Sequence, residues 1–151
     1  MTGFKHILVP YDFTNFADLA FKKAMEIATK FDSKISLITV LGSEINTAGM
    51  SYSRAQEVHD EMEEKTKGDL NRIKESSKNE NVDVSVHIIH ESSTVGGILS
   101  FAEKNNIDLI VIGSHGRSGF KKLVLGSVAA AIITKAQCPV MVVKPTKLSK
   151  N

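Results

Sequence analysis

Short apolar runs alternate along the chain with segments in which apolar residues recur at helical spacing. This alternation predicts strands separated by helices. Short apolar runs of the kind found in buried strands occupy residues 5–10, 35–40, 82–90, 107–112 and 140–143. The run over 107–112 (IDLIVI) is nearly all apolar, which is typical of a parallel strand covered on both faces.

Apolar residues recur at helical spacing in the four segments between these runs. This spacing predicts helices over 15–31, 54–76, a short stretch from Thr94 to about Ala102, and 127–136. Thr14 or Asn15 is expected to cap the first helix, and Thr94 the third. Residues 42–53 are small and polar and predict a loop. The charged residues over 54–76 are expected to form a solvated helix face.

Strands that alternate with helices are joined by crossover connections, so the chain is expected to form an open, mostly parallel five-stranded α/β sheet with helices on both faces. Its length of 151 residues suits one domain, here 1–151 with an ordered core at about 4–145. Neither an internal repeat nor a linker is evident in the sequence.

Composition narrows the classes of function. The net charge of +2, from 19 Lys+Arg against 17 Asp+Glu, is too small to predict a nucleic-acid or membrane partner. Trp is absent, which argues against a base-stacking platform. Cys138 is the one cysteine, so an internal disulfide is excluded and a buried structural role is expected. The apolar runs are far shorter than the ~20 residues of a membrane span, and the expected location is the cytoplasm.

The candidate chemistry lies where strands end, because ligands of open α/β sheets bind beyond the carboxyl ends of the strands. Asp12 follows the first strand, and Gly113 and Gly116 follow the fourth. Gly126 and Ser127 open the last helix, where unpaired N–H groups attract anions. Basic residues accompany these glycines in the sequence: Arg117, Lys121 and Lys122. Together they predict a phosphate cradle, although the Walker A and dinucleotide-binding patterns are both absent.

Several of these residues have a plainer interpretation. Ser127 could merely cap a helix, and His115 could be a solvated loop residue rather than a phosphate donor. Asp12 could help to hold Mg²⁺ or could bond its own turn. His87 and His90 should point to opposite faces of their strand, which argues against a metal site.

At this point the sequence resembles a known family. The spacing Gly113-x2-Gly116-x9-Gly126-Ser127 is similar to the glycine motif of the universal stress proteins, in their ATP-binding branch, and the likeness extends from KHILVPYDFT to CPVMVVKP. The resemblance implies a Rossmann-like sheet, similar to that of the adenine nucleotide alpha hydrolases, with strand order 3-2-1-4-5. It also implies ATP, or another adenine nucleotide, bound between the first and fourth strands, and Mg²⁺ is expected to accompany the nucleotide.

Carried over by position, the resemblance implies that Asp12 and Val40 contact adenosine and that Pro10 and Ile112 line the base pocket. It assigns ribose and phosphate contacts to Gly113, Gly116, Arg117, Gly126, Ser127 and Val128. It further implies a homodimer formed through the last strand, at about Val140 to Lys144. No nucleic-acid or membrane partner is expected.

Three functions fit these expectations. The first is an ATP-binding regulatory protein of the stress response, acting as a nucleotide-dependent switch. The second is a slow ATPase or an autophosphorylating enzyme, for which the sequence offers no convincing general base. The third is a dimeric interaction module with a non-functional pocket, and the complete glycine motif counts against it.

Overall fold

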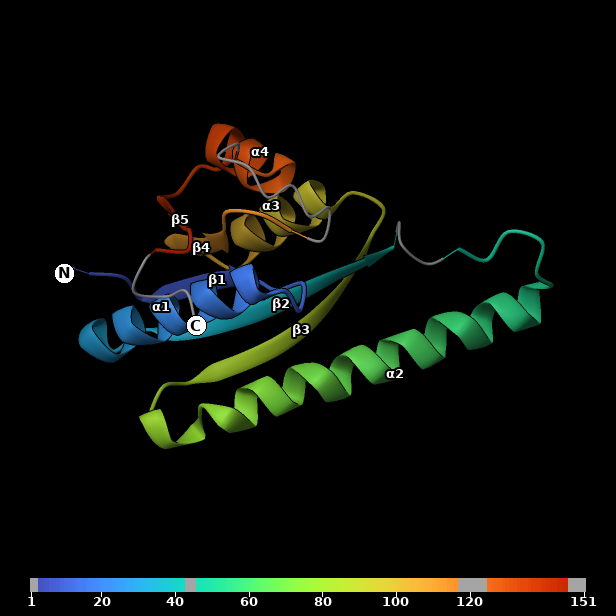
Figure 1. The fold of residues 1–151 in the computed structure, drawn as a ribbon, viewed down its shortest axis with the longest axis horizontal. Helices are drawn as coiled ribbons and strands as arrows, with labels where there is room; N and C mark the ends of the chain where they lie inside the picture. The colour runs from blue at the N-terminus through green and yellow to red at the C-terminus, as the bar shows by residue number, and fades with distance from the viewer. Residues whose placement is uncertain (1–2, 43–45, 117–124, 147–151) are drawn as a thin grey trace.

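Five parallel strands form one sheet in the order β3-β2-β1-β4-β5, which confirms the expected topology (Figure 1). The computed structural model describes residues 3–42, 46–116 and 125–146. The strands are β1 His6–Pro10, β2 Lys34–Gly42, β3 Val84–Glu91, β4 Leu109–Gly113 and β5 Val140–Val143. In the register, Ile7 of β1 lies between Ile35 of β2 and Leu109 of β4.

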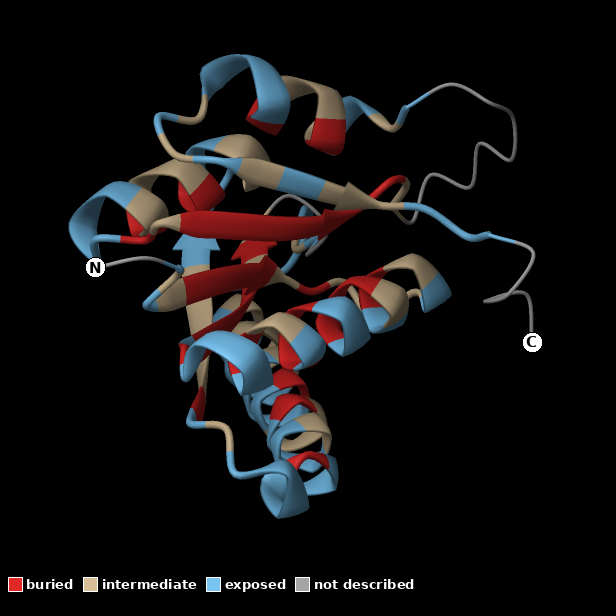
Figure 2. Ribbon diagram, turned by 90° about the vertical axis from the view of Figure 1, so that its left-hand side faces the viewer, coloured by how far each residue is buried: buried red, intermediate tan, exposed pale blue. Residues whose placement is uncertain are grey.

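Helices cover both faces of this sheet. They are α1 Asn15–Phe31, α2 Tyr52–Ser76, α3 Thr94–Lys104 and α4 Ser127–Lys135, with a short 3-10 turn, η1, at Lys78–Glu80. The helices α1 and α2 pack on one face, and α3 and α4 on the other. Figure 2 shows the buried strands between the more exposed outer surfaces of the helices.

Strand alternation divides the core into two layers. The layer between the sheet and helices α1 and α2 contains odd-numbered residues of β1, such as Ile7 and Val9, and Leu70 of α2. The layer between the sheet and helices α3 and α4 contains Leu8 of β1 and Ile132 of α4. Burial of these apolar side chains is the main force holding the helices to the sheet.

The helix starts correct three details of the sequence prediction. The hydroxyl of Thr14 accepts the Ala17 N–H and caps α1, as expected. The cap of α3 is Ser93 rather than Thr94, because the Ser93 hydroxyl accepts the Gly96 N–H. Ser51 caps α2 in the same way, so this helix begins at Tyr52, ahead of the predicted residue 54.

The third correction concerns α4, whose N-cap residue is Gly126 rather than Ser127.

In the parts of the chain that the structure describes, no helix combines the length and apolar character that crossing a membrane requires.

Candidate functional site

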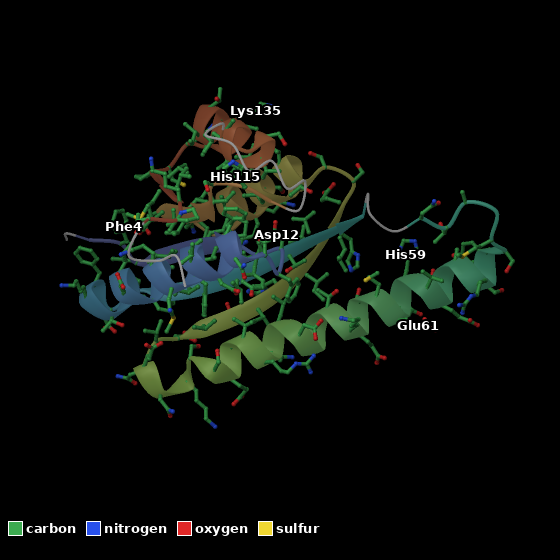
Figure 3. All side chains as sticks on the ribbon, in the orientation of Figure 1. Phe4, Asp12, His59, Glu61, His115 and Lys135 are labelled. Atoms are coloured by element: carbon green, nitrogen blue, oxygen red, sulfur yellow. The ribbon has the colours of Figure 1, made fainter. Side chains whose placement is uncertain are left out.

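A cavity of about 320 Å³ opens at the carboxyl ends of the strands. It lies between β1 and β4, where the strand order changes direction and where open α/β sheets bind ligands. Its volume falls within the range of about 300–1,000 Å³ for small-molecule sites. Asp12 and His115, both labelled in Figure 3, line this cavity.

The structure brings together nine of the ten residues that the sequence singled out. They come from four parts of the chain and all line the cavity: Pro10, Asp12, Val40, Ile112, Gly113, Gly116, Gly126, Ser127 and Val128. The tenth, Arg117, lies outside the described residues, as do Lys121 and Lys122.

The turn after β1 is organised by Asp12. One carboxylate oxygen, Oδ1, accepts hydrogen bonds from the Thr14 N–H at 3.2 Å and the Thr14 hydroxyl at 2.5 Å. The plainer interpretation of Asp12, an aspartate that bonds its own turn, is therefore correct for Oδ1. A Cβ built on Gly116 would lie 3.0 Å from the other oxygen, Oδ2, so the two strand ends meet across the cavity at this oxygen.

Close backbone packing explains two of the glycines. A Cβ on Gly126 would lie 3.0 Å from the carbonyl oxygen of Ser114, and one on Gly113 would lie 2.8 Å from that of Phe16. These glycines are needed wherever the loop after β4 folds this way, whether or not a ligand binds. Gly116 differs, because among the described residues the atom close to its Cβ position belongs to the side chain of Asp12.

The first turn of α4 forms part of the cavity wall. Gly126 has no side chain with which to cap the helix, and its own N–H donates to the Ser114 carbonyl at 2.8 Å. Ser127, Val128 and Ala129 follow it and all line the cavity. First-turn N–H groups and the positive end of the helix dipole favour an anion at such a place.

His115 is held on both sides of its ring. Its Nδ1 lies 3.0 Å from the Ser114 hydroxyl, and the ring packs at 5.1 Å, between centroids, against Phe16 at the start of α1. Because it also lines the cavity, His115 is an oriented wall residue rather than a freely solvated one.

Buried Tyr11, which also lines the cavity, is tied to α1 by an exposed aspartate. The hydroxyl of Tyr11 donates to the carboxylate of Asp18 in α1, and the Tyr11 ring packs edge-on against Phe13. Burial and the bond to Asp18 raise the pKa of Tyr11 far above its usual value. The tyrosine hydroxyl therefore stays protonated and fixes the start of α1 beside the cavity.

The sequence analysis missed several wall residues. Thr94 and Ile98 of α3 line the cavity, as does Thr39, whose hydroxyl donates to the Tyr11 carbonyl at 2.8 Å. The available signal was topological, since α3 begins just after the carboxyl end of β3, at the same edge of the sheet. Gly97 lets α3 approach closely, because a Cβ there would lie 3.1 Å from Val40.

The remaining candidates lie elsewhere. His87 contacts the Phe101 ring of α3 while His90 pairs with Glu63 of α2, which confirms that they point to opposite faces. Among the residues that the structure describes, no group of three or more His, Cys, Asp or Glu side chains could hold a metal ion. Cys138 is half-buried against the layer under α3 and α4, and burial raises the pKa of its thiol.

The fold and the cavity place this protein among the Rossmann-like α/β proteins whose sites lie at a switch in strand order. The universal stress protein family matches residues 3–144, so the chain belongs to that family.

Two relatives from Methanocaldococcus jannaschii show how far the similarity extends. Universal stress protein MJ0531 is 31% identical over 144 residues, which cover 95% of this chain and 84% of the relative. Universal stress protein MJ0577 is 30% identical and covers 93% of this chain and 95% of its own. The solved structure of MJ0577 superposes with a TM-score of 0.85 over 97% of this chain and 99% of that one.

Two more distant structures share the fold. A universal stress protein in complex with cAMP is 16% identical, with a TM-score of 0.64 over 95% of this chain and 98% of that one. A family protein from Arabidopsis thaliana with AMP bound is 19% identical, with a TM-score of 0.64 over 97% of this chain and 95% of that one.

Proposed function

We propose that this protein binds an adenine nucleotide, with ATP as the expected ligand, in the cavity between β1 and β4. The observation that carries the proposal is the meeting of the glycine-rich loop, the start of α4 and the Asp12 turn around one cavity. Two structural neighbours with the same fold hold AMP and cAMP, which supports an adenine nucleotide as the ligand class.

The two sides of the cavity suit the two ends of a nucleotide. Pro10, Val40, Ile98 and Ile112 provide an apolar wall that fits a flat base. On the other side, the first turn of α4 and the backbone around Gly116 offer N–H donors for the phosphates. The Ser127 hydroxyl stands at the same place and could donate to a phosphate oxygen.

Asp12 is the residue we assign to the adenosine part of the nucleotide and to Mg²⁺. Its Oδ1 accepts from Thr14, and its Oδ2 lies on the side of Gly116, 3.0 Å from the position that a Cβ there would take. Mg²⁺ commonly takes one carboxylate together with phosphate oxygens and water. A bound ion would neutralise phosphate charge near the loop after β4.

We assign the protein a regulatory role, in which nucleotide binding changes its conformation or assembly. Fast phosphoryl transfer requires an aligned nucleophile with metal and cationic stabilisation, and the sequence offers no convincing general base for it. A homodimer through β5 belongs to the same proposal, because β5 pairs with β4 on one side and has no partner strand in the described sheet on the other.

The test begins with any nucleotide that the purified protein carries, which is released and identified. ATP with Mg²⁺ is then titrated calorimetrically into the wild type and Gly116→Val. The valine would fill the space beside Asp12 Oδ2, so we expect binding to weaken at least about tenfold. Single-turnover hydrolysis on the same samples separates a switch from a slow ATPase.

Gly68→Ala is the matched control. Gly68 lies in α2, far from the cavity, and a Cβ there meets no atom within 4 Å. This variant should bind ATP as the wild type does. If well-folded wild type binds no adenine nucleotide, the proposal fails and a dimeric interaction module becomes the better description.

A further inference from the structure

The long helix α2 runs past the end of the strand on which it packs. His90, next to last in β3, lies with its Nε2 2.5 Å from Glu63 Oε1, so the strand ends level with Glu63. Residues 52–62 therefore continue beyond β3 for about 16 Å at the usual rise per residue. Figure 1 shows this part of α2 extending away from the strands, and Figure 3 labels His59 and Glu61 on it.

The stripe of α2 that faces the sheet continues along this projecting part. Within the covered part, Leu70 is 0% exposed and Thr66 is 6% exposed, whereas Tyr52 at the other end of the stripe is 85% exposed. Between them lie half-buried residues outside both described core clusters: Ala55, Val58, His59 and Met62. Helices of about this length gain most of their stability from packing of such a stripe, so an uncovered stripe indicates a contact surface.

This end of α2 is also acidic. Residues 52–64, which we call the α2 tip, comprise the projecting residues 52–62 and the next two residues, level with the end of β3. They carry five carboxylates against the single guanidinium of Arg54, a net charge of −4. The carboxylates are Glu57, Asp60, Glu61, Glu63 and Glu64, all of them exposed. Since the whole chain carries +2, the remainder carries +6, and the negative charge is concentrated on this helix end.

A groove of about 430 Å³ adjoins the α2 tip, between α2 and β3. Its apolar lining consists of Leu70, Val86 and Ile88, and its polar lining of Glu63, Lys67, His87 and His90. Glu63 belongs to both the groove and the α2 tip, so the two surfaces adjoin along α2.

We propose that the α2 tip and this groove dock a cationic amphipathic helix of a partner protein. The apolar stripe of the partner would cover Val58 and Met62, and its lysines or arginines would face the carboxylates. Charge excludes the obvious alternatives: two α2 tips would bring −4 against −4, and nucleic acids or anionic lipids would be repelled. This surface is distinct from the cavity and does not depend on nucleotide binding.

The test uses the full chain and a fluorescein-labelled synthetic helix with leucines on one stripe and lysines elsewhere, followed by fluorescence anisotropy. A Val58→Ser/Met62→Ser variant removes the stripe, and an Asp60→Lys/Glu64→Lys variant reverses the charge. Each should weaken binding about tenfold or more, and added salt should weaken wild-type binding. Circular dichroism verifies that α2 remains helical in both variants.

Glu26→Lys/Glu103→Lys is the matched control, because it makes the same charge change on α1 and α3, away from the tip. It should bind the probe as the wild type does. Equal binding of a peptide with scrambled leucines, or unchanged binding by both tip variants, would overturn the proposal. So would sedimentation that shows wild-type assembly lost in the tip variants, because a second copy would then be the occupant.

Discussion

Gly113 lies so close to Phe16 that a Cβ on the glycine would come within 2.8 Å of the Phe16 carbonyl oxygen. This contact joins the end of β4 to the start of α1, and the atom in the way is backbone, which cannot turn aside. Gly113 thus fixes how closely the two walls of the cavity approach.

Replacing Gly113 and Gly116 by alanine should therefore have different consequences. Gly113→Ala is expected to cost about 1–3 kcal/mol of unfolding free energy, because the backbone must shift. Gly116→Ala should cost less, since the atom near its Cβ is a carboxylate oxygen of Asp12. Urea denaturation of the two variants measures the difference, and equal losses would contradict this account of the loop.

Stability should fall with acid partly through His6. Its Nδ1 lies 3.1 Å from the Asn105 carbonyl, which can only accept, so Nδ1 carries the hydrogen and Nε2 accepts from the Ser36 hydroxyl at 2.7 Å. Burial and nearby Lys34 lower the pKa of His6 from its ordinary 6.5. Below 6.5 the unfolded chain therefore binds more protons, and stability is lost as pH falls toward the lowered pKa.

His6→Gln should reduce the slope of unfolding free energy against pH between about pH 7 and pH 5. Urea denaturation across that range supplies the measurement. A His6→Gln slope equal to the wild type would show that the ring does not contribute.

Two adjacent residues of α4 offer a direct test of the core. Ile132 is fully buried under α4, whereas its neighbour Ile133 is 48% exposed. Ile132→Ala should cost about 2–5 kcal/mol, and Ile133→Ala less than about 0.5 kcal/mol. Thermal or urea denaturation distinguishes them, and similar losses would mean that α4 is rotated from the position described.

The proposed dimer predicts an effect at β5. The Ile110 N–H donates to the Pro139 carbonyl and the Ser114 N–H to the Val143 carbonyl, so alternate residues of β5 turn their backbone toward the open edge. A lysine on an edge strand opposes pairing with another chain. Met141→Lys should therefore weaken the dimer, measured by sedimentation velocity. Phe31→Lys, an exposed apolar residue of α1, is the control, and an unchanged dimer in Met141→Lys would argue against β5.

Local signals in the sequence were sufficient for the five strands, whereas the strand order and most cavity residues were expected from the family resemblance. The apolar runs located β1 to β5, and glycines at fixed spacing marked a loop whose backbone packs tightly. Asn15–Phe31 was predicted without error because Thr14 caps it and its apolar spacing is regular.

Other features depend on tertiary geometry and were missed. Ser93 and Thr94 are both good caps, and only the backbone shows that the Ser93 hydroxyl accepts the Gly96 N–H. Thr94 does not cap the helix and instead lines the cavity together with Ile98. The sequence also did not show that α2 extends beyond the end of β3. This conclusion requires both the first residue of α2 and the last residue of β3.

The strand order also has a consequence for the newly made chain. β1 pairs with β2, and β2 with β3, so this half of the sheet can form as soon as it leaves the ribosome. The second wall of the cavity comes from β4 and α4, which are synthesised later. The pairing of Ile7 with Leu109, which joins β1 to β4, can therefore form only after β4 has been made. We therefore expect the cavity to be completed late in synthesis, and a ligand that bridges its walls to stabilise the full-length chain over any shorter nascent form.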